Sequence, residues 1–230
     1  MVDRPGPPRS IDAVVFDCDG VLFDSAGANI AFFDAALARA GYPPLDATGR
    51  ELALSLSTHQ LVDRLFAGAG ERDAVRAAAQ ALDYEPFYQF MTPVPGLHEL
   101  LSRLRREYRL GMATNRGKTA HEVARRFELV PPLECVVGVL EVERPKPHPE
   151  MLLRCAESLG SDPCAVVYVG DQEGDRAAAE AAGMAFVGVG EAPRADVKIG
   201  ALAELPAALA RCEDRLRRGR SARASEGWGR

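Results

Sequence analysis

The stretch "DAVVFDCDGVLFDS", residues 12–25, carries an apolar run directly into two aspartates and a glycine. An apolar run of this length ahead of a glycine is typical of a buried strand, and a strand packed on both faces is typical of a parallel sheet. Two carboxylates, those of Asp17 and Asp19, are therefore expected where a buried strand ends.

The second half of the chain alternates between strands and helices. Further strands are predicted at "RLGMAT", "CVVGV", "AVVYVG" and "MAFVGVG", with helical segments between them. Strands separated by helices of this length predict an α/β fold with a doubly wound parallel sheet. In such sheets the ligand site lies beyond the carboxyl ends of the strands.

Residues 25–92 differ from this pattern, because they contain apolar residues at helical spacing and no convincing strand. Three segments are predicted to be helical: "SAGANIAFFDAALARAGY", "ELALSLSTHQLVDRLFAG" and "ERDAVRAAAQALDYEPFYQF". We therefore expect a discontinuous core domain, residues 1–24 and 93–211, with a helical cap domain at 25–92. The Arg-, Gly- and Ser-rich composition of residues 212–230 predicts a disordered tail.

Composition limits the classes of partner. The net charge is −5, but residues 211–230 hold seven Arg against three acids, so the first 210 residues are near −9. Such a body disfavours nucleic acid, which needs a basic face. No apolar segment approaches the roughly 18 residues of a membrane span, and the first ten residues lack a signal-peptide core. Five scattered cysteines without a CxxC pair indicate reduced thiols, so we expect a cytoplasmic protein without membrane partners.

Polar residues follow several of the predicted strands. Taken singly, each has an ordinary explanation as a turn residue, a helix cap or a solvated lysine. Together, at the same edge of the sheet, they form a chemically complementary set of acids, a hydroxyl, an amide and a lysine. The candidates are Asp17, Asp19, Thr114, Asn115, Lys146, Asp171 and Asp175.

Their order and spacing resemble a known family. "FDCDGVLFDS", "ATN", "RPKPHPE" and "VGDQEGDRAAAEAAGM" resemble the four ordered motifs of the haloacid dehalogenase (HAD) superfamily, in its phosphatase-like, phosphoglycolate phosphatase-like branch with an inserted helical cap. The resemblance covers residues 11–210. Gln172 and Gly174 depart from the residues common at those positions, and neither change removes a charged group.

Phosphoryl chemistry follows from the residue types. A carboxylate can attack phosphorus and form an aspartyl-phosphate, a role expected for Asp17. Carboxylates and a phosphoryl group in one pocket need a divalent cation and a basic side chain, and hard oxygen ligands favour Mg²⁺. Asp19, two residues on, is expected to protonate the leaving oxygen and then deprotonate the attacking water. The Lys146-Pro147 bond is a candidate for the cis form.

The resemblance implies further roles. It implies that Asp17, Asp171 and the backbone carbonyl of Asp19 hold the metal, with Asp175 directly or indirectly involved. It also implies that Lys146 pairs with Asp17 and the phosphate.

The resemblance further implies that the Thr114 hydroxyl and the Asn115 backbone amide bind phosphate oxygens. The acid at position 19 favours phosphoryl transfer over carbon–halogen cleavage.

We therefore predict a Mg²⁺-dependent phosphatase of small phosphorylated metabolites, acting as a monomer or homodimer. A phosphomutase of the same superfamily remains an alternative, because it uses the same core and returns the phosphoryl group to the substrate. A signalling module phosphorylated on Asp is a less favoured alternative, since it needs neither the cap nor the second acid. A HAD-like binding protein without catalysis is a further one, disfavoured by the complete set of side chains.

Overall fold

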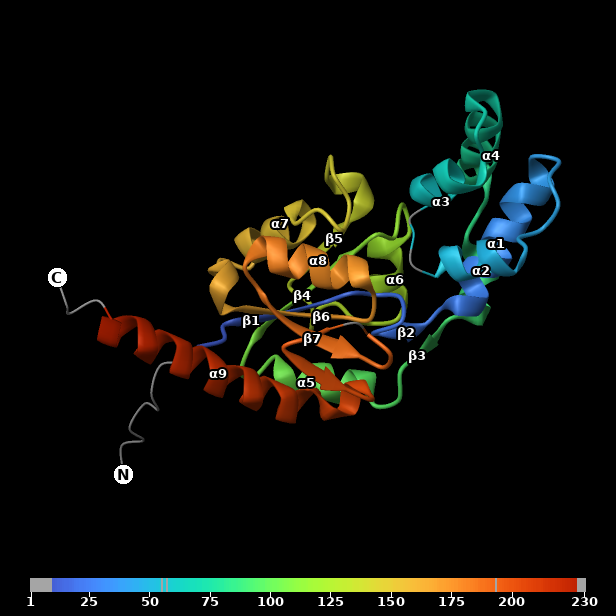
Figure 1. Ribbon diagram of the computed structural model, residues 1–230. Helices are drawn as coiled ribbons and strands as arrows, with labels where there is room; N and C mark the ends of the chain where they lie inside the picture. The colour runs from blue at the N-terminus through green and yellow to red at the C-terminus, as the bar shows by residue number, and fades with distance from the viewer. Residues whose placement is uncertain (1–9, 55, 57, 193, 227–230) are drawn as a thin grey trace.

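A computed structural model describes residues 10–54, 56, 58–192 and 194–226 of the chain. A six-stranded sheet lies at its centre, with strand order β5-β4-β1-β6-β7-β8 and parallel pairing throughout (Figure 1). The strands are β1 (Ala13–Phe16), β4 (Arg109–Thr114), β5 (Cys135–Gly138), β6 (Val166–Gly170), β7 (Ala185–Val189) and β8 (Val197–Ile199). The predicted doubly wound parallel sheet is confirmed. Strand β8 was not predicted, because three residues are too few to show a strand pattern.

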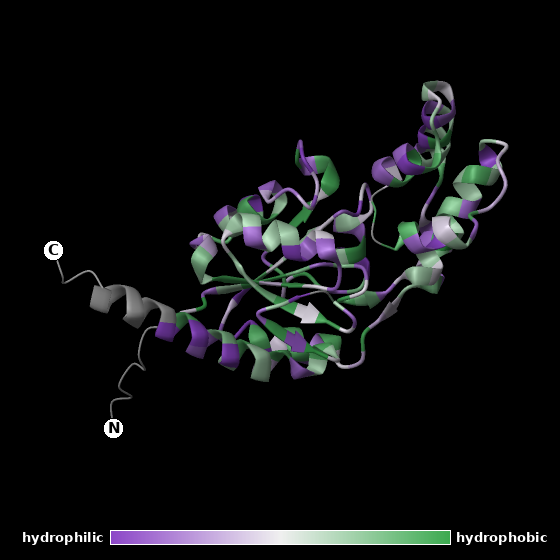
Figure 2. Cartoon of the chain, in the orientation of Figure 1, coloured by the Kyte–Doolittle hydropathy of each residue, from purple (hydrophilic) through white to green (hydrophobic). Residues whose placement is uncertain are grey.

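Strand β1 lies in the middle of the sheet, and its two faces are both buried. Val14 and Phe16 contribute to one hydrophobic cluster, whereas Ala13 and Val15 contribute to a second cluster on the opposite face. This alternation follows from the two-residue period of a strand. Figure 2 shows hydrophobic colour along the central strands and mixed colour on the surrounding helices. Burial of both faces explains why the sequence of β1 is apolar throughout.

Helices cover both faces of the sheet, with α7 and α8 on one side and α5 and α9 on the other (Figure 1). Their bounds are α5 (Leu97–Leu104), α6 (Ala120–Arg126), α7 (Glu150–Ser158), α8 (Glu173–Ala182) and α9 (Leu205–Glu226), with short 3₁₀ helices η2 (Val139–Glu141), η3 (Pro163–Ala165) and η4 (Leu202–Glu204). Within the described residues, none of the helices combines the length and the apolar character needed to cross a membrane.

A group of helices is inserted between two short strands, β2 (Phe23–Asp24) and β3 (Thr92–Pro93), and stands beyond one end of the sheet (Figure 1). The inserted helices are α1 (Ala26–Arg39), α2 (Ala47–Ala53), α3 (Thr58–Leu65), α4 (Ala69–Ala81) and the 3₁₀ helix η1 (Glu85–Phe90). The segment predicted as one helix from residue 51 is divided between α2 and α3. Helix α2 begins earlier, where the Asp46 side chain accepts a hydrogen bond from the Gly49 N–H at 2.7 Å.

The inserted helices leave and rejoin the sheet at one place. Strands β2 and β3 pair antiparallel, with Phe23 opposite Pro93 and Asp24 opposite Thr92. The boundaries predicted at 24/25 and 92/93 fall in or beside this pair of strands. That the two parts behave as separate domains stays a prediction.

The expectation of a disordered tail from residue 212 is wrong for residues 212–226, because α9 continues to Glu226. Its first turns are held by packing, since Cys212 is buried in the main hydrophobic cluster and Leu216 packs against that cluster. Because the segment is rich in Arg, its few apolar residues were not recognised as a buried helix face. Residues 227–230 lie outside the described part of the chain.

Helix α9 also holds the segment that leads into β1. The Glu213 carboxylate is buried and accepts hydrogen bonds from the backbone N–H groups of Ser10 and Ile11, each at 3.1 Å. Two buried backbone donors therefore depend on one side chain.

Replacing Glu213 by alanine should lower the free energy of unfolding by about 2–3 kcal/mol, because two buried N–H groups lose a charged acceptor. Arg217→Ala is the control, since Arg217 lies 3.4 Å from Glu213 and is about half exposed; its effect should stay below about 1 kcal/mol. Urea unfolding of both variants measures the difference. Equal losses in the two variants would contradict the role assigned to Glu213.

Candidate active site

The residues predicted at the strand ends meet around one buried ammonium group. Lys146 Nζ lies 2.9 Å from Asp17 Oδ1 and 2.7 Å from Asp175 Oδ1. Asp17 follows β1, Asp175 lies in the first turn of α8, and Lys146 lies in the Pro-rich loop before α7. All three side chains are almost completely buried. The expected pairing of Lys146 with Asp17 is present, and the Lys146–Pro147 bond is cis, as predicted.

A third contact of Lys146 was not predicted. Its Nζ also donates a hydrogen bond to the Tyr168 hydroxyl at 2.9 Å, and that hydroxyl donates to the Ala113 carbonyl at 2.9 Å. Lys146 Nζ thus donates hydrogen bonds to Tyr168 and Asp175, whereas its contact with Asp17 Oδ1 is an ion pair without hydrogen-bond geometry. Tyr168 lies within an apolar strand and is fully buried, which made it look like a packing residue in the sequence.

The charges of Asp17, Lys146 and Asp175 shift the pKa values of one another. Burial disfavours the charged form and raises the pKa of Asp17; Lys146 opposes the shift, while Asp175 and Asp171 add to it. Burial alone would lower the pKa of Lys146, but the carboxylates of Asp17 and Asp175 raise it above its ordinary value. The site therefore holds more negative charge than one lysine neutralises.

The carboxylates of Asp17, Asp171 and Asp175 form a cluster that could hold a metal ion, with one oxygen of each within 4.8 Å of the others. Asp171 Oδ1 is buried without a hydrogen-bond partner in the described structure, and burial raises the Asp171 pKa to about 6. Its other oxygen accepts from the Gln172 side chain at 2.7 Å. An unpaired buried carboxylate oxygen beside two further acids fits an oxygen-binding divalent cation.

Two local features place these acids. The Asp175 Oδ2 atom accepts from the backbone N–H groups of Asp171 and Gln172, each at 3.1 Å, which fixes the turn after β6. Gly20 has φ +79°, and a Cβ there would lie 2.3 Å from Asp171 Oδ2. The glycine after Asp19 is therefore required by both backbone conformation and close approach.

Thr114 ends β4, and Asn115, the next residue, holds the loop that carries Lys146. Asn115 accepts from the Lys146 backbone N–H at 3.1 Å and donates to the Lys146 carbonyl at 3.2 Å. Thr114 Oγ1 accepts from the Arg116 N–H at 3.2 Å, and its side chain is buried. The structure thus brings Thr114 and Asn115 to the site, as predicted.

Asp19 lies in a different environment from Asp17. Its carboxylate pairs with Arg116, with Nη2 2.6 Å from Oδ1 and Nε 3.2 Å from Oδ2, and Oδ1 also accepts from the Ser25 hydroxyl. Burial opposes ionisation, but the Arg116 charge and hydrogen bonds hold the Asp19 pKa below its usual range. Arg116 was not predicted, and its position directly after "ATN" was the signal that could have found it.

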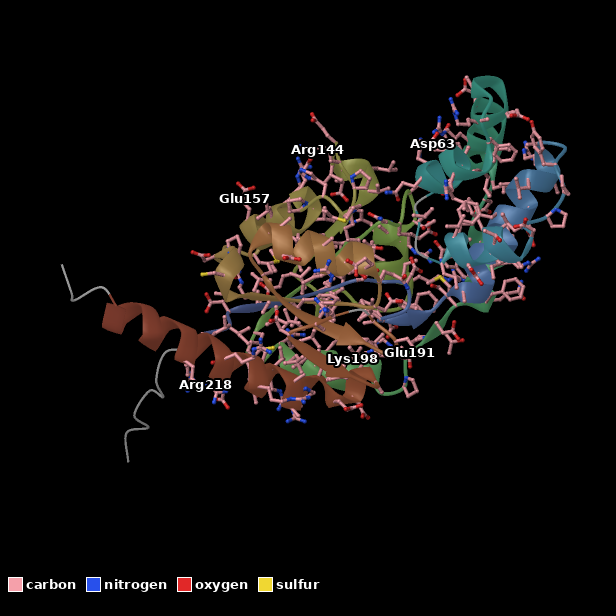
Figure 3. All side chains as sticks on the ribbon, in the orientation of Figure 1. Asp63, Arg144, Glu157, Glu191, Lys198 and Arg218 are labelled. Carbon is pink, nitrogen blue, oxygen red and sulfur yellow. The ribbon has the colours of Figure 1, made fainter. Side chains whose placement is uncertain are left out.

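A cavity of about 350 Å³ opens between the sheet and the inserted helices. Its floor includes Asp17, Asp19 and Lys146. Its roof mixes apolar and polar side chains, among them Phe32, Leu56, His59, Gln60, Arg76 and Tyr84. Figure 3 labels Asp63 on α3, the carboxylate that pairs with Arg76 at 2.5 Å. The predicted site residues therefore line a partly open cavity roofed by the inserted helices, except for Asp171, which lines a neighbouring cavity.

Comparison with known proteins agrees with this fold and site. The family model for haloacid dehalogenase-like hydrolases matches residues 14–189. A phosphoglycolate phosphatase of Cereibacter sphaeroides is 33% identical over 181 residues, covering 75% of this chain and 82% of the relative. A β-phosphoglucomutase of Bacillus subtilis is 28% identical over 190 residues, covering 78% and 83%.

Comparison with a solved structure also indicates this family. The crystal structure of a HAD-superfamily hydrolase, subfamily IA, from Geobacter sulfurreducens has a TM-score of 0.70 and 33% identity, and the match covers 87% of this chain and 97% of that one. The chain belongs to the haloacid dehalogenase-like hydrolase family. Its relatives and fold support an enzyme of the phosphatase type.

Replacing Tyr168 by phenylalanine should lower the free energy of unfolding by about 1–3 kcal/mol, because one Lys146 N–H and the Ala113 carbonyl lose a buried partner. Tyr42→Phe is the matched control, since it removes a hydroxyl from a half-buried ring of the inserted helices. Urea unfolding measures both. A loss in Tyr168→Phe no larger than that in Tyr42→Phe would contradict the role of this hydroxyl.

Proposed function

We propose that the protein is a Mg²⁺-dependent phosphatase that hydrolyses small phosphorylated metabolites through an aspartyl-phosphate on Asp17. One observation carries the proposal: the buried Lys146 ammonium lies against Asp17 and Asp175 on the floor of a cavity. Lys146 favours the ionised form of Asp17, whereas burial and the neighbouring acids raise its pKa, and the ionised carboxylate is the form that attacks phosphorus.

The first half-reaction forms the phosphoenzyme. A carboxylate oxygen of Asp17 bonds to phosphorus as the bond from phosphorus to the leaving oxygen breaks. Asp19, which must first take up a proton against the effect of Arg116 on its pKa, gives that proton to the leaving oxygen. The Thr114 hydroxyl and the Asn115 backbone amide are proposed to bind phosphate oxygens, with Lys146 offsetting negative charge as it develops.

The second half-reaction releases phosphate. Water attacks phosphorus and gives its proton to Asp19, while the electron pair of the phosphorus–oxygen bond returns to the Asp17 carboxylate. Dividing the displacement into two steps lets one carboxylate serve twice, first as an acid and then as a base.

The metal is proposed to be held by the carboxylates of Asp17 and Asp171 and the backbone carbonyl of Asp19, with Asp175 fixing the turn beside them. When bound, Mg²⁺ would offset the charge of the acids and the phosphoryl group. The buried, unpaired Asp171 Oδ1 atom supports this arrangement.

A phosphomutase of the same family is a second candidate, supported by the similarity to the Bacillus subtilis β-phosphoglucomutase. Incubation with a sugar phosphate separates the two, because a mutase returns an isomeric sugar phosphate and a phosphatase releases inorganic phosphate. We also propose that the protein is cytoplasmic, that its partner is a small molecule, and that it is a monomer or a homodimer.

Mg²⁺ should stabilise the protein in the absence of substrate. At a tenfold excess over Kd the gain is about 1.4 kcal/mol, or about 3–5 °C in Tm for a chain of this size. Asp171→Asn should abolish the shift, whereas Asp214→Asn, which alters an exposed acid on α9, should retain it. Ca²⁺ should substitute poorly in turnover, and full activity in excess EDTA would contradict the metal assignment.

The two aspartates should differ in pre-steady-state kinetics with p-nitrophenyl phosphate, whose leaving group departs without a proton. Asp19→Asn should release a burst of about one equivalent of nitrophenol and then turn over slowly, because the water has lost its base. Asp17→Asn should show neither burst nor turnover, since an amide is not a competent nucleophile. Stopped-flow absorbance measures both.

Two outcomes would reverse these assignments: a burst from Asp17→Asn, or equally fast turnover of p-nitrophenyl and alkyl phosphates by Asp19→Asn. Circular dichroism of each variant excludes unfolding as the cause, which matters because Asp19→Asn leaves buried Arg116 without its carboxylate partner.

A further inference from the structure

Arg116 is a buried cation to which the proposed chemistry assigns no role. Its side chain is 5% exposed and its guanidinium forms a two-point pair with Asp19, with Nη2–Oδ1 2.6 Å and Nε–Oδ2 3.2 Å. Nη1 donates to Thr119 Oγ1 at 3.3 Å. The planar fork of arginine is held at several points, so the orientation of the carboxylate opposite it is fixed.

The two oxygens of Asp19 are not used equally. Oδ1 accepts from Arg116 Nη2 and from the Ser25 hydroxyl, which occupies both of its lone pairs. Within the described residues, Oδ2 has a hydrogen bond from Arg116 Nε alone, so one lone pair stays open. Asp19 lines the cavity, and of its two oxygens Oδ2 is the one with a lone pair open to accept a proton.

The opposite side of the guanidinium rests against the inserted helices. Arg116 Cζ lies 5.2 Å from the centroid of the Tyr84 ring, which is buried and packs against Phe32 and Phe87. Ser25 immediately precedes α1. The two residues that orient Asp19 thus belong to the loop after β4 and to the first residue of the insertion.

We propose that Arg116 is a positioning residue for the second half-reaction: together with Ser25 it occupies Oδ1 of Asp19 and presents Oδ2 to the water that hydrolyses the phosphoenzyme. The inference rests on the proposed function, because it assumes an aspartyl-phosphate on Asp17. In this step the water oxygen bonds to phosphorus, the proton goes to Asp19 Oδ2, and the bond from phosphorus to Asp17 breaks with its electron pair returning to the carboxylate.

Arg116→Lys is the decisive variant, because it keeps the positive charge beside Asp19 and loses the two-point geometry. With p-nitrophenyl phosphate we expect a burst of about one equivalent of nitrophenol at the wild-type burst rate, then steady turnover at least tenfold below wild type. A variant damaged only in its structure would lose burst rate and steady turnover together, or show no burst.

Arg126→Lys is the matched control. Arg126 also joins the inserted helices to the core, pairing with Glu85 at 2.7 Å and lying 4.5 Å over the Tyr88 ring, but its position is exposed and its described contacts do not include Asp19. The burst and the steady turnover of Arg126→Lys should match those of the wild type. Ser25→Ala serves as a second variant in case Arg116→Lys does not fold, and it should show the same burst followed by slow turnover.

The outcomes separate this inference from the proposed function. If Asp19→Asn shows the burst and folded Arg116→Lys turns over as wild type does, the positioning role of Arg116 is overturned and the proposed function stands. If Arg116→Lys does not fold, wild-type turnover by Ser25→Ala overturns the inference. If Asp19→Asn itself shows no burst, the assignment of Asp19 fails, and the inference fails with it.

Discussion

The buried ammonium of Lys146 is the interaction on which the rest of the site depends. Three carboxylates within 4.8 Å of one another would repel strongly in a site with little water, and the cost of burying them is offset only by an opposite charge. Lys146 meets two of these acids directly. One cation cannot neutralise three anions, so the arrangement leaves a place for a divalent ion. The neighbouring acids add to the effect of burial in raising the pKa of Asp17.

The sheet topology brings these groups together from distant parts of the chain. Strand β1 lies between β4 and β6, with Phe16 level with Met112 on one side and Val169 on the other. The residues that follow the three strands therefore emerge side by side. Tyr168 of β6 links the loop that carries Lys146 to β4, because its hydroxyl accepts from the lysine and donates to the Ala113 carbonyl.

Residues that come directly at the end of a strand could be placed at the site from sequence, as Asp17, Thr114 and Asp171 show. Residues whose role depends on a distant partner could not. Arg116 contacts Asp19, which lies 97 positions earlier in the sequence. Tyr168 looks like a core residue in the sequence because its ring is buried in the core. The same limit explains α9, whose buried Glu213 satisfies backbone groups more than 200 positions away.

The two aspartates of the opening motif stand two residues apart and have opposite electrostatics. Burial among acids raises the pKa of Asp17, while Arg116 lowers that of Asp19 although burial opposes it. Burial decides the direction for Asp17, although Lys146 opposes the shift, whereas the partner Arg116 decides it for Asp19. Asp17 is governed by the sheet and its lysine, whereas Asp19 is governed by residues that contact or begin the inserted helices. A change in those helices is therefore expected to alter the contacts of Asp19 first and to leave Asp17 and Lys146 in place.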